Sequence, residues 1–300
     1  ANNIPNGFGT CVRKFIKYTG EWYNGLPHGK GIAIYKRLYP CYFYDYELGK
    51  HHTYRYEGKL KDGYFDGKGL LLRENKKFYE GEFTEGTMTG YGTLYNDKDV
   101  ENNKIYEGNF KNGQFNGYGM FFNKEGHKVY VGNWITGQKE GFGKLYVITI
   151  SKVIPYYEGY FKKGKFNGRG KIVDNIMRKS GIFVNSHLNG TGTYEDKFTK
   201  YQGEFVNDQF NGYGTLVNKQ LNKTYIGNFN NNTLNGKGTL HYSNNNVYEG
   251  NFTNNLRNGD GIYYDMKGNY RIEATWKNDK KEGCGSIIYN DGNSFKCTWK

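Results

Sequence analysis

A unit of about 23 residues recurs through almost the whole chain, and it constrains the fold more than any other feature of the sequence. Each unit opens with Tyr-x-Gly-x-aromatic and later carries Gly-x-Gly. The opening tyrosines are Tyr18, Tyr56, Tyr79, Tyr106, Tyr130, Tyr157, Tyr201, Tyr225 and Tyr248. A period of this length indicates a solenoid, in which each unit buries its apolar face only against its neighbours.

The residues within one unit predict a β-hairpin. Strand side chains alternate between faces, so Tyr79, Gly81 and Phe83 share one face and Glu80 and Glu82 share the other. Three residues after the aromatic comes a position held only by glycine, serine, aspartate or asparagine, and apart from serine these residues tolerate positive φ best. Its members are Gly25, Gly63, Gly86, Gly113, Gly137, Gly164, Ser186, Asp208, Asn232, Asn255 and Asp279. We therefore expect a left-handed turn there, closing two antiparallel strands. The glycines of Gly-x-Gly leave room for a ring to lie flat on the backbone.

The fold class that follows is all-β: an elongated single-layer solenoid of about eleven stacked antiparallel hairpins. The units start near residues 18, 56, 79, 106, 130, 157, 179, 201, 225, 248 and 272, and those at 179 and 272 are degenerate. Half units flank them, with Gly7 and Gly9 at one end and residues 295–299 at the other. We expect one continuous array over residues 1–300 with an aromatic-rich insertion at 36–55. Because the chain lacks an initial Met and starts and stops inside repeats, we expect a segment of a longer protein.

Composition excludes several classes of protein. The chain has 36% hydrophobic and 18% aromatic residues, which suits a thin sheet better than a deep aliphatic core. No apolar run reaches the length of a membrane-spanning helix and no signal peptide is apparent, so we expect a cytoplasmic protein. The four cysteines show no Cys-x-x-Cys spacing. The net charge of +13 would draw the chain to acidic lipid, acidic protein or nucleic acid, but we favour a solvated rim of lysines that maintains solubility as its explanation.

No residue constellation with catalytic or ligand-binding chemistry is found in the sequence. Gly63 to Gly69 has the wrong spacing for a phosphate loop, and the adjacent His51 and His52 would point to opposite faces of a strand. The glutamates that follow the repeat tyrosines are predicted to pair with lysines on neighbouring strands. We therefore predict no enzyme activity, no catalytic residues, no cofactor and no metal, and we do not expect nucleic-acid binding, because the tyrosine register fits sheet packing better than base stacking.

The motifs Tyr-Glu-Gly-Glu-Phe at 79–83 and Asn-Gly-Tyr-Gly-Thr-Leu at 211–216 resemble the MORN repeat, the membrane occupation and recognition nexus motif. The resemblance covers essentially the whole chain. It implies a row of hairpins in a non-catalytic module that binds protein partners, forms dimers, or holds a larger protein near a membrane or cytoskeleton. Such modules occur in cortical scaffold proteins of parasites, in radial-spoke proteins and junctophilins, and in lipid kinases and methyltransferases.

The chain departs from the family pattern in two places that give candidate partner-binding residues. Where the family often carries Lys or Arg, five residues after the strand aromatic, this chain has apolar residues. These are Phe65, Met88, Phe115, Phe166, Leu188, Phe210 and Leu234. They could form an apolar ridge for a partner helix or strand, or pack on one another between hairpins. The insertion adds Tyr42, Phe43 and Tyr44.

Our leading hypothesis is a scaffold for protein–protein interaction and membrane-proximal or cortical cytoskeletal assembly, with an extended or helical protein partner. The Asn, Lys and Tyr bias suggests a protist such as an apicomplexan. One alternative is a targeting or regulatory module of a larger enzyme, for example a lipid kinase or methyltransferase. Another is direct, weak binding to acidic phospholipid. Phe295, Cys297 and Trp299 lie on the first strand of an incomplete hairpin, whose open edge could pair two copies end to end as a homodimer.

Overall fold

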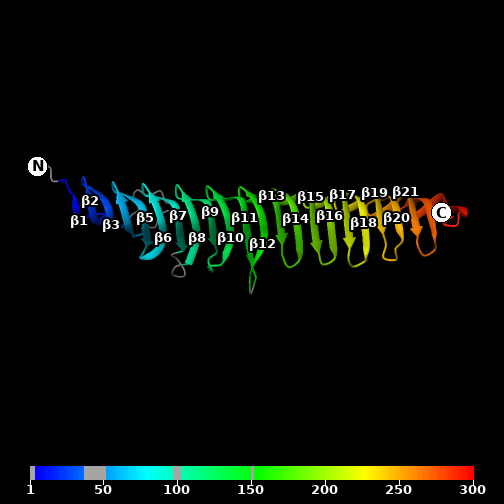
Figure 1. The fold of residues 1–300 in the computed structure, drawn as a ribbon, viewed down its shortest axis with the longest axis horizontal. Helices are drawn as coiled ribbons and strands as arrows, with labels where there is room; N and C mark the ends of the chain where they lie inside the picture. Colours follow the sequence, from blue (N-terminus) through cyan, green and yellow to red (C-terminus); the bar gives the residue numbers. More distant parts are fainter. Residues whose placement is uncertain (1–3, 37–51, 97–102, 150–151) are drawn as a thin grey trace. The chain divides into compact units, whose positions relative to one another are not determined.

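The computed structural model describes residues 4–36, 52–96, 103–149 and 152–300. The chain divides into two compact units, one of residues 1–155 and 161–164 and the other of residues 156–160 and 165–300. Throughout the described ranges the regular elements are β-strands, and strands adjacent in sequence pair in antiparallel fashion (Figure 1). No helix in these ranges is long and apolar enough to cross a membrane. The predicted all-β fold of antiparallel hairpins is confirmed.

In the first unit, the strands from β1 to β11 pair in sequence order, each with the next. Their bounds are β1 Gly7–Arg13, β2 Ile16–Tyr23, β3 Leu26–Tyr35, β4 Tyr54–Lys61, β5 Tyr64–Arg73, β6 Lys76–Thr84, β7 Thr87–Asn96, β8 Asn103–Lys111, β9 Gln114–Phe122, β10 Lys128–Ile135 and β11 Gln138–Ile148. Strand β12, Val153–Lys162, contributes residues to both units.

In the second unit the same order continues from β13 to β24. The bounds are β13 Lys165–Val173, β14 Met177–Val184, β15 His187–Asp196, β16 Thr199–Val206, β17 Gln209–Asn218, β18 Lys223–Asn230, β19 Thr233–His241, β20 Val247–Thr253, β21 Leu256–Asp265, β22 Tyr270–Lys277, β23 Lys280–Tyr289 and β24 Ser294–Trp299.

The turn that closes each repeat has the predicted left-handed conformation. All eleven predicted turn positions have positive φ, from 65° at Asn232 to 87° at Gly63. In every repeat the residue just before is left-handed too, for example Asn24 with φ of 46° before Gly25. Two consecutive positive φ values define a type I′ turn, whose twist matches that of the flanking strands. The glycine, asparagine and aspartate pattern therefore reports this turn directly.

The two glycines of Gly-x-Gly have different roles, although the sequence suggested one role for both. The first glycine has positive φ in every full repeat, for example 57° at Gly90 and 58° at Gly212. It lies where the hairpin register shifts, as between Gly81 and Glu82 against β7. This is a β-bulge that needs a left-handed residue. Only the second glycine, such as Gly92, leaves space for a ring.

The core is a row of tyrosine rings that lie on pairs of glycines. Gly81 and Gly92 are cross-strand partners, and a Cβ built on either would contact the ring of Tyr79. The Tyr79 side chain is fully buried, and its ring packs edge-on against Phe83 at 5.0 Å and Phe110 of the next repeat at 5.2 Å. Each edge-on pair contributes about 0.5–1.5 kcal/mol beyond its buried area. Successive hairpins are therefore joined by ring contacts as well as by strand pairing.

The degenerate repeat at 179 compensates for its missing tyrosine. Lys179 takes the tyrosine position, and the fully buried Leu188 lies where the ring would lie, close to Gly181 and Gly192. The β14 and β15 pairing is kept, with Gly181 opposite Gly192. The hairpin survives because an apolar side chain from its second strand covers the glycine pair.

Candidate interaction surface

The repeat tyrosines are hydrogen-bond donors rather than reactive groups. Tyr79 Oη donates to the carbonyl of Glu82 at 3.1 Å, and Tyr225 Oη donates to that of Asn228 at 3.0 Å. Burial raises the pKa of Tyr201, Tyr225 and Tyr248 to about 12. These hydroxyls are protonated at neutral pH, so they hold the fold and are not poised as nucleophiles or bases.

The glutamates that follow these tyrosines form ion pairs, mostly along their own strand. Glu80 pairs with Lys77 at 2.9 Å and Glu107 with Lys104 at 2.7 Å, both within one strand. Glu158 pairs across strands with Lys171 at 2.9 Å, as the sequence predicted. The expected cross-strand partner was wrong for the first two, because the strand register shifts just before each repeat tyrosine and brings the lysine three residues before the glutamate within reach of its carboxylate.

The seven apolar candidates five residues after the strand aromatic are packed into the core. Phe65, Met88 and Leu188 are buried, and the others are half-buried. Four phenylalanines stack face to face on the tyrosine of their own repeat, at centroid distances of 3.8–3.9 Å. These pairs are Phe65 on Tyr56, Phe115 on Tyr106, Phe166 on Tyr157 and Phe210 on Tyr201. This geometry favours the packing interpretation, and partner binding by these residues stays a prediction.

The remaining candidates lie at the insertion and on β24. Tyr42, Phe43 and Tyr44 lie outside the described residues. On β24, Phe295 is 59% exposed, whereas Cys297 and Trp299 are half-buried. Within the described chain β24 pairs with β23 alone, so its other side offers backbone donors and acceptors. End-to-end pairing of two copies stays a prediction.

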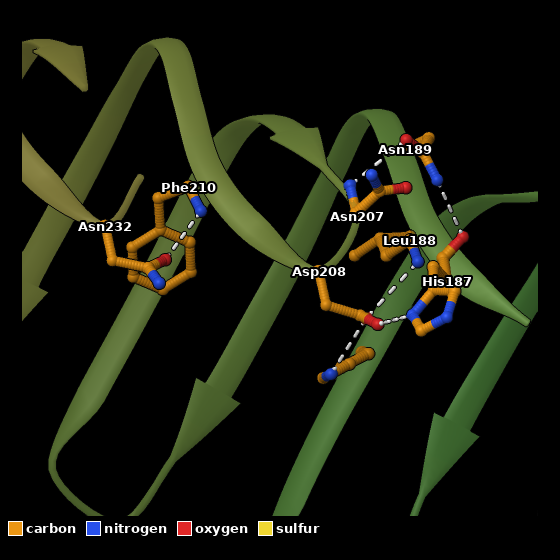
Figure 2. Close-up of polar contacts among 8 residues, drawn as sticks. His187, Leu188, Asn189, Asn207, Asp208, Phe210 and Asn232 are labelled. Carbon is orange, nitrogen blue, oxygen red and sulfur yellow. Dashed lines mark hydrogen bonds and ion pairs between the residues drawn. The ribbon is translucent and has the colours of Figure 1, made fainter. Parts of the chain in front are cut away.

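The turn residues of the second unit clamp neighbouring hairpins together (Figure 2). The Asp208 amide donates to the Leu188 carbonyl at 2.9 Å, and its carboxylate accepts from the Leu188 amide at 3.2 Å. Asn232 makes the same two contacts with Phe210, at 3.0 Å and 2.7 Å. In the first unit glycine holds this position, so only the backbone bond can form, as from Gly86 to Phe65 at 2.9 Å. The sequence predicted the turn but not the clamp.

Asp208 also gathers two basic groups. Lys179 Nζ lies 3.0 Å and His187 Nδ1 2.8 Å from its carboxylate oxygens. Burial alone would raise the pKa of Asp208, but the hydrogen bonds from His187, Lys179 and the Leu188 amide outweigh it and lower the pKa below its ordinary value. The lysine that replaces the repeat tyrosine is thus used by the next hairpin.

An open depression in the second unit has the protein's own Arg257 in its lining. It is lined by Tyr242, Tyr263, Tyr270 and Trp276 among others. The Arg257 guanidinium lies 4.0 Å from the Trp276 ring and donates to Asp279 at 3.0 Å. The Trp276 ring in this depression is therefore already paired with a cation of the protein itself. In the part of the chain that the structure describes, no three His, Cys, Asp or Glu residues are grouped to hold a metal ion.

The opposite face of the sheet exposes aromatic side chains that the sequence reasoning missed. They occupy the middle position of Gly-x-Gly: Tyr91 is 52% exposed, Tyr118 57%, Phe142 44% and Tyr213 58%. The signal was present in the sequence. The second glycine of each pair faces the core, so the aromatic residue just before it must point away from the core by strand alternation.

Comparison with known proteins identifies the family. The MORN repeat matches at residues 18–36, 56–76, 79–100, 106–127, 130–146, 157–175, 201–218, 225–247, 248–270 and 273–294. The tyrosine-free repeat at 179 is not among these matches. A similar protein is MORN repeat-containing protein 3 of Xenopus laevis, 34% identical over 84 residues, which are 28% of this chain and 32% of the relative. The chain spans about a third of the length of that relative. Ten matches in register with the hairpins show that this chain belongs to the MORN repeat family.

Proposed function

We propose that this chain is a non-catalytic scaffold that binds a protein partner and supports membrane-proximal or cortical cytoskeletal assembly. The observation that carries the proposal is that the two faces of the sheet differ. On one face the tyrosine and phenylalanine rings are buried against one another, and the tyrosine hydroxyl groups donate hydrogen bonds to backbone carbonyls. The other face repeats the same positions every two strands, about 9.6 Å apart, which suits a long regular partner.

The chemistry of the described residues supports a binding rather than a catalytic role. Glu80 and Glu107 are tied to lysines, which lower the pKa of each carboxylate through hydrogen bonds. A general acid or base working near neutral pH needs the opposite shift. The cytoskeletal and cortical part of the proposal comes from the MORN family resemblance.

The proposal is tested by following the tagged chain in cells and in fractionation. We expect it at the cell cortex, retained with the cytoskeletal pellet after detergent, and joined by chemical cross-links to a protein partner that binds the purified chain stoichiometrically. A diffuse chain that leaves the pellet with detergent and forms no stoichiometric complex would overturn the scaffold.

Direct binding to acidic phospholipid is the second candidate, favoured by adjacent exposed-face lysines. Lys30 on β3 lies opposite Lys59 on β4, and Lys68 follows on β5. Attachment to acidic vesicles should be weak and salt-sensitive, because distributed charge without a second anchor gives only marginal binding. Flotation with phosphatidylserine vesicles at low and high salt decides this. Tight binding that persists at high salt would contradict the expectation. A parent enzyme that uses this chain for targeting remains a third proposal, tested by sequencing the regions on either side.

A further inference from the structure

The exposed aromatics of the first unit form a regular row, here called the aromatic ladder: Tyr91 on β7, Tyr118 on β9 and Phe142 on β11. They occupy the same position in three consecutive repeats. A Cβ on Gly92, Gly119 or Gly143 would contact the repeat tyrosine on the core face, and the preceding residue therefore points to the opposite face. The three rings share one face.

Asparagines between the rungs fix the ladder. Asn109 lies opposite Tyr91 and Asn133 lies opposite Tyr118 in the strand register. Asn109 Nδ2 donates to the Tyr118 carbonyl at 3.2 Å, and Asn133 Nδ2 donates to the Phe142 carbonyl at 3.4 Å. Each amide nitrogen carries two hydrogens, so one remains for a ligand. The surface thus alternates a ring with an amide donor.

A row of lysines continues the ladder. Lys30 on β3 and Lys68 on β5 hold the same Gly-x-Gly position in the two preceding repeats, and Lys59 lies between them on β4. Among the described residues none of the three has an ion pair, although Glu82 lies opposite Lys68 in the register. Like charges on opposed residues destabilise a sheet unless something compensates them. A ligand that runs along the ladder should therefore be acidic at this end.

The spacing of the rungs selects the conformation of the ligand. Rungs two strands apart are separated by about 9.6 Å. One turn of polyproline II, three residues, advances about 9.3 Å and returns to the same face. Two turns of α-helix, seven residues, advance about 10.5 Å. Over the four rung intervals from β3 to β11 the mismatch with the rungs adds up to about 3.6 Å for the helix and about 1.2 Å for polyproline II. An extended strand advances about 10 Å in three residues but then presents its opposite face.

We propose that this face of the first unit binds a proline-rich segment in the polyproline II conformation, with acidic residues at one end. Prolines at every third residue lie against Tyr91, Tyr118 and Phe142. The repeat of three residues continues past the proline at Tyr91, away from the other two prolines, with one acidic side chain against Lys68 and the next against Lys30. Polyproline II has no internal hydrogen bonds, so its carbonyls accept from the asparagine amides and the Tyr118 hydroxyl. The inference rests on the proposed scaffold function and names the chemistry of its partner.

The test measures binding of synthetic peptides to the full chain by fluorescence anisotropy. The probe has the pattern Glu-x-x-Glu-x-x-Pro-x-x-Pro-x-x-Pro. A second probe has the same pattern in the reverse chain direction. The comparison peptide has the same composition with prolines spaced by four. We expect one direction of the probe to bind about tenfold more tightly than the comparison peptide, a difference of about 1.4 kcal/mol in binding free energy.

Variants of the chain assign the surface. Substituting Tyr91, Tyr118 and Phe142 with serine should weaken probe binding by about tenfold or more, with the circular dichroism spectrum unchanged because the side chains are exposed. Tyr213→Ser is the matched control: it removes an equally exposed ring at the same position of a repeat with no aromatic at the neighbouring rungs, and should leave binding unchanged. The double variant Lys30→Glu and Lys68→Glu should weaken binding and reverse its salt dependence.

Three results would overturn the inference: no binding of either probe, equal binding of the comparison peptide, or unchanged binding by the triple serine variant. The localisation of the wild-type chain, set beside the peptide measurements, separates this inference from the scaffold proposal. If the peptides fail but the chain is still retained at the cortex with its partner, the scaffold stands and the proline-rich ligand is wrong. If the wild-type chain is not retained, the scaffold proposal itself fails.

Discussion

Asp208 and Leu188 are joined by two hydrogen bonds, backbone amide to carbonyl at 2.9 Å and backbone amide to carboxylate at 3.2 Å. Asp208→Asn should retain both and lose only the contacts to Lys179 and His187, costing up to about 1 kcal/mol. Asp208→Ala loses the acceptor and places alanine at a φ of 67°, which should cost about 2–3 kcal/mol in total. The free energy of unfolding, measured with denaturant, should fall less for Asp208→Asn than for Asp208→Ala. Equal stability of the two variants would contradict the clamp.

The Asp208 carboxylate should make the stability of the fold depend on pH in the acidic range. The pKa of Asp208 in the folded chain is below its ordinary value of 3.8. The carboxylate therefore contributes fully to the free energy of unfolding above the pKa of the unfolded chain, and this contribution is lost as the pH falls through the lower pKa of the folded chain. Asp208→Asn should therefore flatten the loss of stability in that acidic range, and unfolding measured across it in wild type and variant shows the difference. Identical slopes would show that the carboxylate gains nothing on folding.

The glycine beneath each ring admits no side chain. Gly92→Ala would place a Cβ 2.5 Å from Tyr79 Cζ, and the ring cannot move because Phe83 and Phe110 hold it. We expect a loss of about 1–3 kcal/mol. Gly9→Ala is the control, because the nearest atom there is Trp22 Nε1 at 3.5 Å, an ordinary contact. Its effect should be within about 0.5 kcal/mol. Thermal melts of both variants test the difference, and equal melting temperatures would exclude the ring-on-glycine packing.

Alkaline pH should unfold the chain through its tyrosines. The folded pKa of Tyr201, Tyr225 and Tyr248 is raised by burial from 10.0 to about 12. A raised pKa gives stability that is complete below pH 10 and is lost as pH rises toward 12. We expect tyrosinate absorbance of these rings to appear together with the loss of the β circular dichroism signal. Ionisation of every tyrosine near pH 10 in a folded chain would contradict their burial.

Substitution of Phe115 distinguishes packing from partner binding at the apolar positions five residues after the strand aromatic. Its ring stacks on Tyr106 at 3.9 Å and contacts Trp134 at 5.3 Å, so Phe115→Ala should destabilise the fold by about 3 kcal/mol. Tyr118→Ala, on the same strand and 57% exposed, is the matched control and should change stability by about 0.5 kcal/mol or less. A stable Phe115→Ala variant that loses a partner would instead support the binding hypothesis.

The open side of β24 predicts association of two copies. Light scattering of the intact chain should report a dimer, and deletion of residues 294–300 should give a monomer with the remaining β-structure intact by circular dichroism. Persistence of the dimer after the deletion would place the pairing elsewhere.

The sequence was sufficient to predict the hairpins because their two determinants are local. The residue types at Gly86, Asp208 and Asn232 report positive φ, and alternation alone places Tyr79 and Phe83 on one face. The bulge at Gly90 was not predictable, because the glycine that needs positive φ and the glycine that needs space under a ring look identical in sequence. The burial of Phe115 depends on a stacking partner nine residues away, and spacing alone cannot distinguish an apolar ridge from an apolar layer.

Repeat tyrosines such as Tyr79, Tyr106 and Tyr248 cover a glycine pair within their own hairpin and touch one aromatic ring of the next, so a hairpin carries its own core with it. A whole hairpin can therefore be gained or lost by duplication or deletion within a gene while its neighbours re-form the same contacts. Chain length in such a protein can change in steps of one hairpin, and a binding row can grow or shrink to fit its partner without redesign of the interior.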